Sequence, residues 1–360
     1  MNSLLARILY ILLAVILFGI MIAIHEFGHF FTAKLFKVKV NEFAIGMGPT
    51  IWSRTKGETQ YSLRAFPIGG FCAMEGEDED TGDPRAFSRQ AAWKRIIILC
   101  AGSAMNFIMG LVIVVLLYTG ITAVRVPVIT EFAEGFQLEG ESGLMAGDRI
   151  TEVDGHGIWC YEDVLTFLGR NDGNGIDLEI ERNGERILLE NFQMPIREYS
   201  YQGETYTGFG LIFGGAEELS FGGRLRLGVI QAFDYVRTVW ISLSDLVTGR
   251  VGLNQLSGVI GVVDVVSEVG ANSATVADGI LNVLSIMSLI AVNLAVMNLL
   301  PIPALDGGRI LFIILNGIIY LFFRRRIPEK YEGYVHTGAF FLLIVLMLLI
   351  AFKDVWSIFT

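Results

Sequence analysis

The chain has 360 residues, of which 53% are hydrophobic and 18% are charged; its mean hydropathy is +0.55 and its net charge is −10. A soluble domain of this size would carry about a quarter charged residues. The composition therefore excludes a purely soluble protein and predicts an integral membrane protein with a substantial soluble part. We expect no nucleic-acid partner. Three scattered cysteines predict neither a disulfide framework nor a cysteine zinc site.

The first apolar segment, within residues 1–35, carries the pentapeptide HEFGH, which begins at His25. No small-residue cleavage site precedes it, so we expect this segment to be retained as a transmembrane helix. On a helix, His25 and His29 lie on one face and can bind one Zn²⁺, and Glu26 can take a proton from the zinc-bound water. Ionisable residues in a membrane segment are expensive and usually functional. A chance match is the competing interpretation.

Residues 36–93 are expected to form a cytoplasmic, membrane-associated β segment and loop. Short alternating runs, Val38–Phe43 and Gln60–Phe66, lie among glycines and indicate a hairpin. An exposed strand edge would hold an extended substrate segment by strand addition. The alternative is a hairpin that only covers the active site. A second transmembrane helix is expected over 94–119.

Residues 120–200 predict a small β-rich domain. The segment Ser142–Gly155 resembles the Gly-Leu-x-x-Gly-Asp-x-Ile signature of PDZ domains, Tyr161–Gly169 would be its helix, and Asn183-Gly184 predicts a tight hairpin turn. Whether this domain captures free C-termini or acts as a steric filter is left open. Residues 201–278 are expected to be a linker with an amphipathic helix, Arg224–Leu246, on the outer membrane surface. That helix could instead belong to the core of the soluble domain.

A third transmembrane helix is expected over 279–305, ending in an LDG sequence that contains Asp306. Residues 306–332 would form a cytoplasmic loop with a fourteen-residue apolar helix, 310–323, too short to favour a span. The fourth transmembrane helix is expected over 333–353. Four spans would place both termini on one side of the membrane.

Charge predicts the orientation. The loop 32–95 carries ten Lys and Arg residues, whereas residues 119–278 contain no lysine. The positive-inside rule then places this loop in the cytoplasm and the soluble domain and termini outside. At about 1.5 Å per residue, His25 lies about 26 Å along its helix from Ile8, close to the cytoplasmic edge, and Asp306 reaches the same depth. Asp306 could complete an open three-ligand zinc site; alone it would be a helix-end charge in a turn.

The HEFGH sequence and the run Asn298–Gly307, NLLPIPALDG, closely resemble the site-2 protease family of intramembrane zinc metalloproteases. The resemblance is to the bacterial sigma-E protease, or regulator-of-sigma, branch with one PDZ domain. The second span departs from the family's Gly-Pro-x-x-Asn pattern, because it reads GSAMN, and Arg309 replaces a common histidine.

The resemblance implies roles for six residues. His25, His29 and Asp306 would bind one Zn²⁺, and Glu26 would be the catalytic base. Asn298 and Asn293 would engage the substrate backbone, although interhelical hydrogen bonding explains Asn293 equally well.

The expected fold is a polytopic α-helical membrane protein with four transmembrane helices, a membrane-associated β-hairpin segment and one inserted extracytoplasmic PDZ domain. The protein would lie in the bacterial plasma membrane and perform regulated intramembrane proteolysis. Its partners would be single-span membrane proteins, such as anti-sigma factors or signal-peptide remnants, after a first extracytoplasmic cut. The alternative is an inactive scaffold that binds partners through its PDZ domain. A CAAX-type or heat-shock-type zinc protease would need a downstream glutamate ligand and leaves the NxxPxPxLDG run unexplained.

Overall fold

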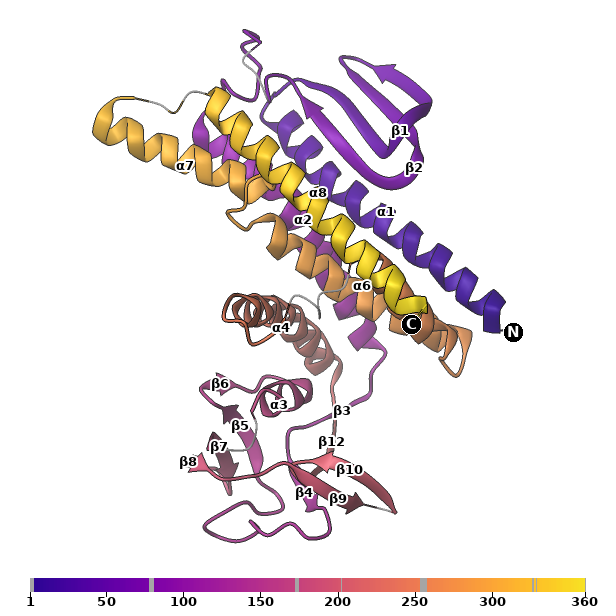
Figure 1. Ribbon diagram of the computed structural model, residues 1–360, viewed down its shortest axis with the longest axis vertical. Coiled ribbons are helices and arrows are strands. Elements are labelled where there is room, and N and C mark those ends of the chain that lie inside the picture. Colours follow the sequence, from indigo (N-terminus) through magenta and orange to yellow (C-terminus); the bar gives the residue numbers. More distant parts are fainter. Residues whose placement is uncertain are drawn as a thin grey trace. The chain divides into compact units, whose positions relative to one another are not determined.

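The computed structural model describes residues 3–77, 81–171, 175–201, 203–252, 258–325, 327 and 329–359. The chain divides into two compact units, coloured along the sequence in Figure 1. The membrane unit consists of Met1–Val114 and Tyr235–Thr360, and the inserted unit consists of Val115–Asp234.

Five helices among the described residues are long and apolar enough to cross a membrane by length and composition. They lie within α1 (Ser3–Leu35), α2 (Ala92–Thr119), α6 (Val276–Asn298), α7 (Asp306–Phe323) and α8 (Glu329–Phe359). The prediction of a membrane protein with several apolar helices is confirmed. The count of four spans stays a prediction, because α7 has 18 residues rather than the expected fourteen.

The third apolar helix ends earlier than we expected. The predicted end at residue 305 is wrong, because α6 ends at Asn298 and Asp306 is instead the first residue of α7. Pro301 and Pro303 explain the break, since proline has no backbone N–H and disfavours helical geometry in the preceding residue. The loop folds back onto the first turn of α7, where a Cβ on Gly307 would strike the Leu300 carbonyl oxygen.

The predicted hairpin is present as β1 (Val40–Lys56) and β2 (Thr59–Met74), which pair antiparallel. Both strands are bent, so the first half of β1 lies between the two halves of β2. Phe43 pairs with both Tyr61 and Cys72. One edge of the resulting sheet is therefore the segment 70–74, and the other edge is the segment 50–56. The sheet, the end of α1 and the start of α2 share a buried apolar cluster that includes Val40, Met74 and Ile98.

Helix α5 (Val259–Ala271) occupies part of the predicted linker, and the linker prediction is wrong there. Its side chains join those of α1 and α6 in a second apolar cluster, which includes Val266 and Val283. Tyr10 of α1 lies against Gly270 and Gly279, where any Cβ atom would collide with its ring. Small residues at these positions let apolar helices pack closely.

The inserted unit contains a four-stranded sheet in the order β6-β5-β7-β8. Its strands are β5 (Arg149–Val153), β6 (His156–Gly157), β7 (Ile176–Arg182) and β8 (Glu185–Phe192), and α3 (Tyr161–Leu168) contributes to the same core. The predicted helix and hairpin are confirmed. Asn183 and Gly184 have φ values of 54° and 84°, the left-handed geometry that a tight hairpin turn requires.

The inserted unit continues beyond the predicted boundary at residue 200, so the expected linker is wrong here too. Strand β9 (Arg197–Tyr201) pairs with β10 (Glu204–Gly208), β11 (Leu211–Phe213) with β4 (Ile129–Phe132), and β12 (Ala216–Glu218) with β3 (Ala123–Arg125). The predicted amphipathic helix is present as α4 (Phe221–Val247). Its location on a membrane surface and the PDZ assignment stay predictions.

Candidate metal centre

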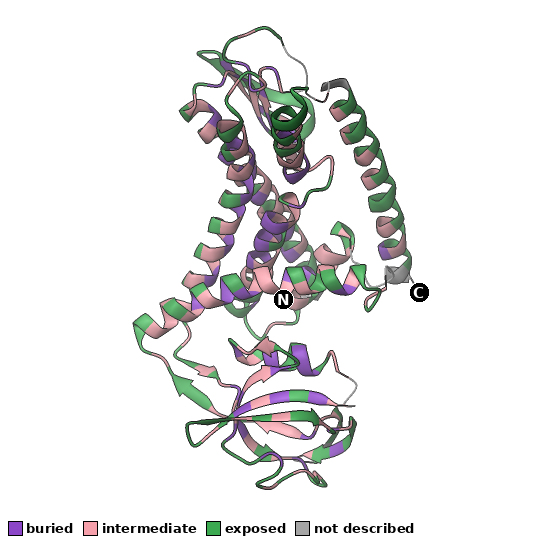
Figure 2. Cartoon of the chain, turned by 90° about the vertical axis from the view of Figure 1, so that its left-hand side faces the viewer, coloured by how far each residue is buried: buried purple, intermediate pink, exposed green. Residues whose placement is uncertain are grey.

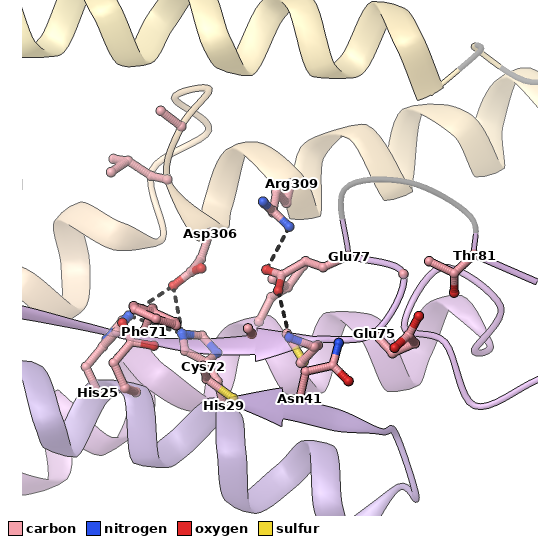
Figure 3. Close-up of a pocket in the computed structure, with 17 residues that line it drawn as sticks. His25, His29, Asn41, Phe71, Cys72, Glu75, Glu77, Thr81, Asp306 and Arg309 are labelled. Atoms are coloured by element: carbon pink, nitrogen blue, oxygen red, sulfur yellow. Dashed lines mark hydrogen bonds and ion pairs between the residues drawn. The ribbon is translucent and has the colours of Figure 1, made fainter. Parts of the chain in front are cut away.

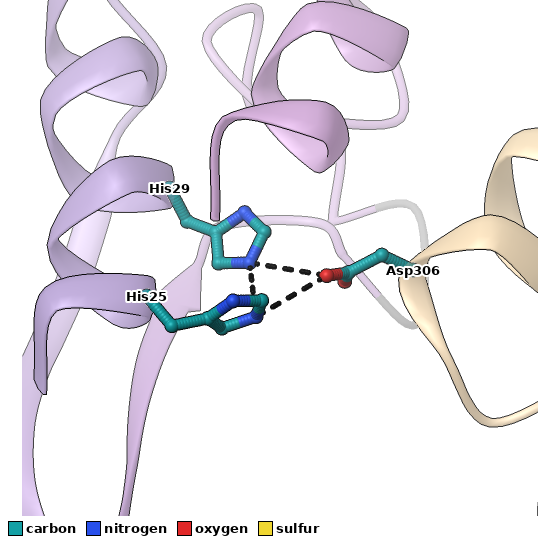
Figure 4. A group of neighbouring side chains, drawn as sticks. All are labelled: His25, His29 and Asp306. Atoms are coloured by element: carbon teal, nitrogen blue, oxygen red, sulfur yellow. Dashed lines mark hydrogen bonds and ion pairs between the residues drawn. The ribbon is translucent and has the colours of Figure 1, made fainter. Parts of the chain in front are cut away.

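Three side chains converge on one point in the membrane unit, as Figure 4 shows. One helical turn of α1 separates His25 from His29, and their Nε2 atoms lie 3.1 Å apart. The Oδ2 atom of Asp306, at the start of α7, lies 3.3 Å from Nε2 of His25 and 3.4 Å from Nε2 of His29. The residues His25 and His29 are 9% and 6% exposed. The three donor atoms thus form a nearly equilateral triangle between largely buried side chains.

The geometry and chemistry of this triangle fit zinc. Zinc binds nitrogen and oxygen ligands at about 2.0–2.2 Å in a tetrahedron, so two of its ligand atoms lie about 3.3 Å apart. His29 Nδ1 lies 2.8 Å from the Ile98 carbonyl oxygen, to which it donates its proton. Its Nε2 atom therefore presents a lone pair to the Asp306 carboxylate and to the His25 imidazole. Lone pairs that face one another repel, and a cation bound between them would remove this repulsion.

His25 has a partner on α2. The side-chain amide of Asn106 lies 3.4 Å from Nδ1 of His25, and Asn106 is 2% exposed. Its Oδ1 atom has no hydrogen-bond partner among the described residues. Rotating the amide by half a turn aims Oδ1 at His25, where it accepts the Nδ1 proton and leaves Nε2 as the metal ligand.

Two glycines allow α1 and α2 to meet at the site. A Cβ atom on Gly28, the fourth residue of the pentapeptide, would overlap the Ala101 carbonyl oxygen. A Cβ atom on Gly102 would overlap Nε2 of His29 and lie 2.7 Å from Cε1 of His25. The glycine of HEFGH is thus required by helix packing, and Gly102 leaves the space that the two rings occupy.

Two cavities meet at the triangle and share His25, Glu26 and Asp306. The larger, of about 740 Å³, extends along the edge segment of β2 to a polar end, where Arg309 and Glu77 form an ion pair of 2.8 Å (Figure 3). The smaller, of about 270 Å³, is lined by Asn106, Leu294 and Asn298.

Glu26 faces the larger cavity beside the edge segment. Its carboxylate lies near the backbone N–H of Cys72. Gly70 also lies against Glu26, since a Cβ atom there would be 3.4 Å from its Cγ atom. A peptide lying along this edge would therefore pass the carboxylate and the metal ligands.

The structure brings together five of the six residues that we singled out. His25, Glu26, His29 and Asp306 adjoin one another, and the amide of Asn298 lies 3.5 Å from Nε2 of His25. Asn293 is exposed and lines neither cavity. Asn106 and Gly102 also contact the histidines but were not predicted as site residues, although both belong to the GSAMN run that departs from the family pattern.

The model of a protein family described as "Peptidase family M50" matches residues 13–346 of the chain. The chain belongs to this family. A "Putative zinc metalloprotease" of Clostridium acetobutylicum is 34% identical over 96% of this chain and 97% of that protein. The zinc metalloprotease RasP of Shouchella clausii is 28% identical over the whole of both chains. The regulator of sigma-W protease RasP of Bacillus subtilis is 26% identical over 96% of this chain and 98% of that protein.

Family membership establishes the general activity. This M50 chain is a zinc metalloprotease, and its several long apolar helices fit a multi-pass membrane protein. The predictions of the family, of the enzyme class and of the zinc cofactor are confirmed.

Proposed function

We propose that this M50 chain is an intramembrane endopeptidase that cuts single-span membrane proteins, with His25, His29 and Asp306 as zinc ligands and Glu26 as the catalytic base. One observation supports the proposal most directly. The apolar helices α1 and α7 place the ligand atoms of His25, His29 and Asp306 in a triangle with edges of 3.1–3.4 Å. Charged groups at such a depth are expensive unless they pair or bind a metal.

The proposed chemistry divides between the ion and the protein. Bound zinc supplies a Lewis acid that acidifies water and polarises the scissile carbonyl. Glu26 takes the proton of the attacking water on its carboxylate and then gives it to the leaving amine. His29, fixed by the Ile98 carbonyl, and His25, beside Asn106, keep their lone pairs aimed at one point.

One edge of the hairpin sheet supports a binding mode for the substrate. A transmembrane helix must become extended before one of its peptide bonds can reach the metal. Residues 70–74 form a strand edge that lines the larger cavity beside Glu26, and an extended segment can pair with such an edge. Asn298, on the far side of the ligands, would hold the substrate backbone. The same role for Asn293 stays a prediction without a contact to support it.

The charge distribution supports an orientation in the bacterial plasma membrane. The basic loop 32–95 would face the cytoplasm, with the metal centre near that face, and the lysine-free inserted unit would lie outside. The name of the Bacillus subtilis relative, regulator of sigma-W protease, supports anti-sigma factors as the substrate class. The first cut would be made outside by another protease, and the PDZ-like unit would select trimmed substrates.

The decisive experiment is a substrate trap. Glu26→Gln should retain zinc and lose at least about 10²-fold in cleavage rate, because it removes only the base. His25→Ala and Asp306→Ala should lose both zinc and cleavage. Co-expressed Glu26→Gln should then accumulate truncated single-span proteins, identified by mass spectrometry. Capture of the same intact proteins by wild type and Glu26→Gln, with no cleavage by either, would instead favour the inactive scaffold.

A further inference from the structure

Ala304 lies two residues before the proposed ligand Asp306 in an unusual backbone conformation. Its φ value is 79°, in the left-handed region that residues with a Cβ atom rarely adopt. Ala304 lines both cavities at the metal centre. A strained conformation persists only where its surroundings hold it in place. The contacts of Ala304 therefore bear directly on how Asp306 is presented.

Ala304 forms a hydrogen bond with a side chain of α8. Nδ1 of His336 accepts a hydrogen bond of 2.9 Å from the Ala304 backbone N–H, which places the imidazole proton on Nε2. The His336 ring also packs on Phe312 of α7, with ring centroids 5.4 Å apart. His336 thus contacts the chain both before Asp306 and in the helix that Asp306 begins.

Ordinary helix packing does not account for a histidine at this position. The most apolar part of α8 has no buried residue, and Figure 2 shows most of the described helix as exposed. A polar side chain in such a helix is expensive in a membrane unless it has a partner or a function. The contact with the loop before Asp306 supplies the partner.

We infer that His336 is a positioning residue for Asp306, holding the left-handed turn at Ala304 so that the carboxylate meets the two imidazoles. The inference rests on the proposed role of Asp306 as a zinc ligand. His336 is not one of the proposed ligands, so it would act through its contacts with Ala304 and Phe312. Loss of an outer partner of a metal ligand typically weakens metal affinity about 10–100-fold, and we expect a change of that size here.

The test uses the purified full-length protein and measures zinc affinity by competition with a chelator, together with kcat and KM. His336→Leu removes the acceptor and should weaken zinc affinity about 10–100-fold, lowering kcat more than it changes KM. His336→Gln retains an acceptor and should recover most of the affinity. Thr337→Leu, a neighbouring polar-to-leucine change at an exposed site, should have no effect.

A second variant separates positioning from a general structural role. Glycine adopts the left-handed conformation without strain, so Ala304→Gly should restore zinc affinity when it is added to the His336→Leu protein. Equal loss in the single and the double variant would overturn the positioning role, and so would unchanged zinc affinity and kcat in His336→Leu.

Asp306→Ala separates this inference from the proposed function. If Asp306→Ala loses zinc affinity and His336→Leu adds no further loss in that background, both assignments are supported. If Asp306→Ala loses affinity but His336→Leu has no effect alone, the positioning role fails and the ligand set stands. Full zinc affinity in Asp306→Ala would remove Asp306 from the ligand set, and the inference would fail with it.

Discussion

Gly102 of α2 faces the His29 ring so closely that a Cβ atom on it would overlap the ring's Nε2 atom. The missing side chain is therefore part of the metal centre, because it creates the space into which both imidazoles turn. Backbone atoms of α2 cannot move away easily, since Gly28 is packed equally closely against the Ala101 carbonyl. Helix packing and metal geometry are coupled at this crossing.

Gly102→Ala should displace the histidine rings and lower zinc affinity at least about 10-fold, with loss of cleavage in parallel. Zinc content after dialysis against a chelator provides the measurement. Gly317→Ala is the matched control, because a Cβ atom there meets nothing within 4 Å in α7. Normal zinc affinity in Gly102→Ala would mean that the helices separate without disturbing the ligands.

Asn106 offers a test of the outer hydrogen bonds. Asn106→Leu should weaken zinc affinity about 10–100-fold, because the His25 ring loses the group that fixes its tautomer. Asn106→Asp keeps an acceptor for the Nδ1 proton and should retain most of the affinity. Metal competition on both variants measures the difference. Equal zinc affinities of the Asn106→Leu and Asn106→Asp variants would show that Asn106 contributes to packing alone.

Strand addition can be tested by disulfide cross-linking in a Glu26→Gln protein without its native cysteines. Ala73→Cys places a thiol on the edge segment that lines the larger cavity. It should cross-link to a cysteine near the cleavage site of a bound substrate. Ser53→Cys lies on the opposite edge of the same sheet and should not. Cross-linking at Ser53 but not at Ala73 would place the substrate elsewhere.

The number of spans can be measured by labelling single cysteines from outside intact cells. In the four-span prediction, a cysteine at Asn183 is labelled, whereas cysteines at Thr81 and Arg325 are protected. Labelling after permeabilisation should reach all three and provides the control. External labelling at Arg325 would mean that α7 crosses the membrane, which its 18 residues allow.

Removal of the strand-rich part of the inserted unit tests its role as a filter. The Thr122 carbonyl accepts a hydrogen bond of 2.9 Å from the Leu219 N–H, so a short glycine linker can replace residues 123–218. A filter predicts that trimmed substrate is still cut and that untrimmed substrate is now cut as well. Capture of new C-termini predicts slower cleavage of trimmed substrate and no gain on the intact one. Cleavage of both substrates by the deleted and full-length proteins provides the comparison.

Local patterns in the sequence were sufficient for the ligand-bearing segments. Helical spacing places His25 and His29 on one face, and the run of apolar residues around them predicts the membrane helix. The Asn183-Gly184 turn and helix α3 were likewise predicted, because neighbouring residues determine both. These features depend on interactions within a few residues, which the chain order makes explicit.

Such local patterns do not predict which strands pair when the strands are far apart in the sequence. Phe43 pairs with two segments of β2, and no local signal shows that a strand will bend and pair twice. Helix α5 was missed because its apolar run is too short to predict a span. The α6 boundary was misplaced because apolar composition outweighed Pro301 and Pro303 in the prediction, although proline determines where the helix stops.

The double pairing of β1 also has a consequence for where substrates are cut. Phe43 is paired on both sides, so the 70–74 edge keeps a fixed register beside Glu26. A substrate strand paired with that edge advances in steps of about 3.3 Å per residue, and each step reverses which side chains face the protein. The position of the scissile bond would then be determined by its distance along the unwound segment rather than by a preferred residue.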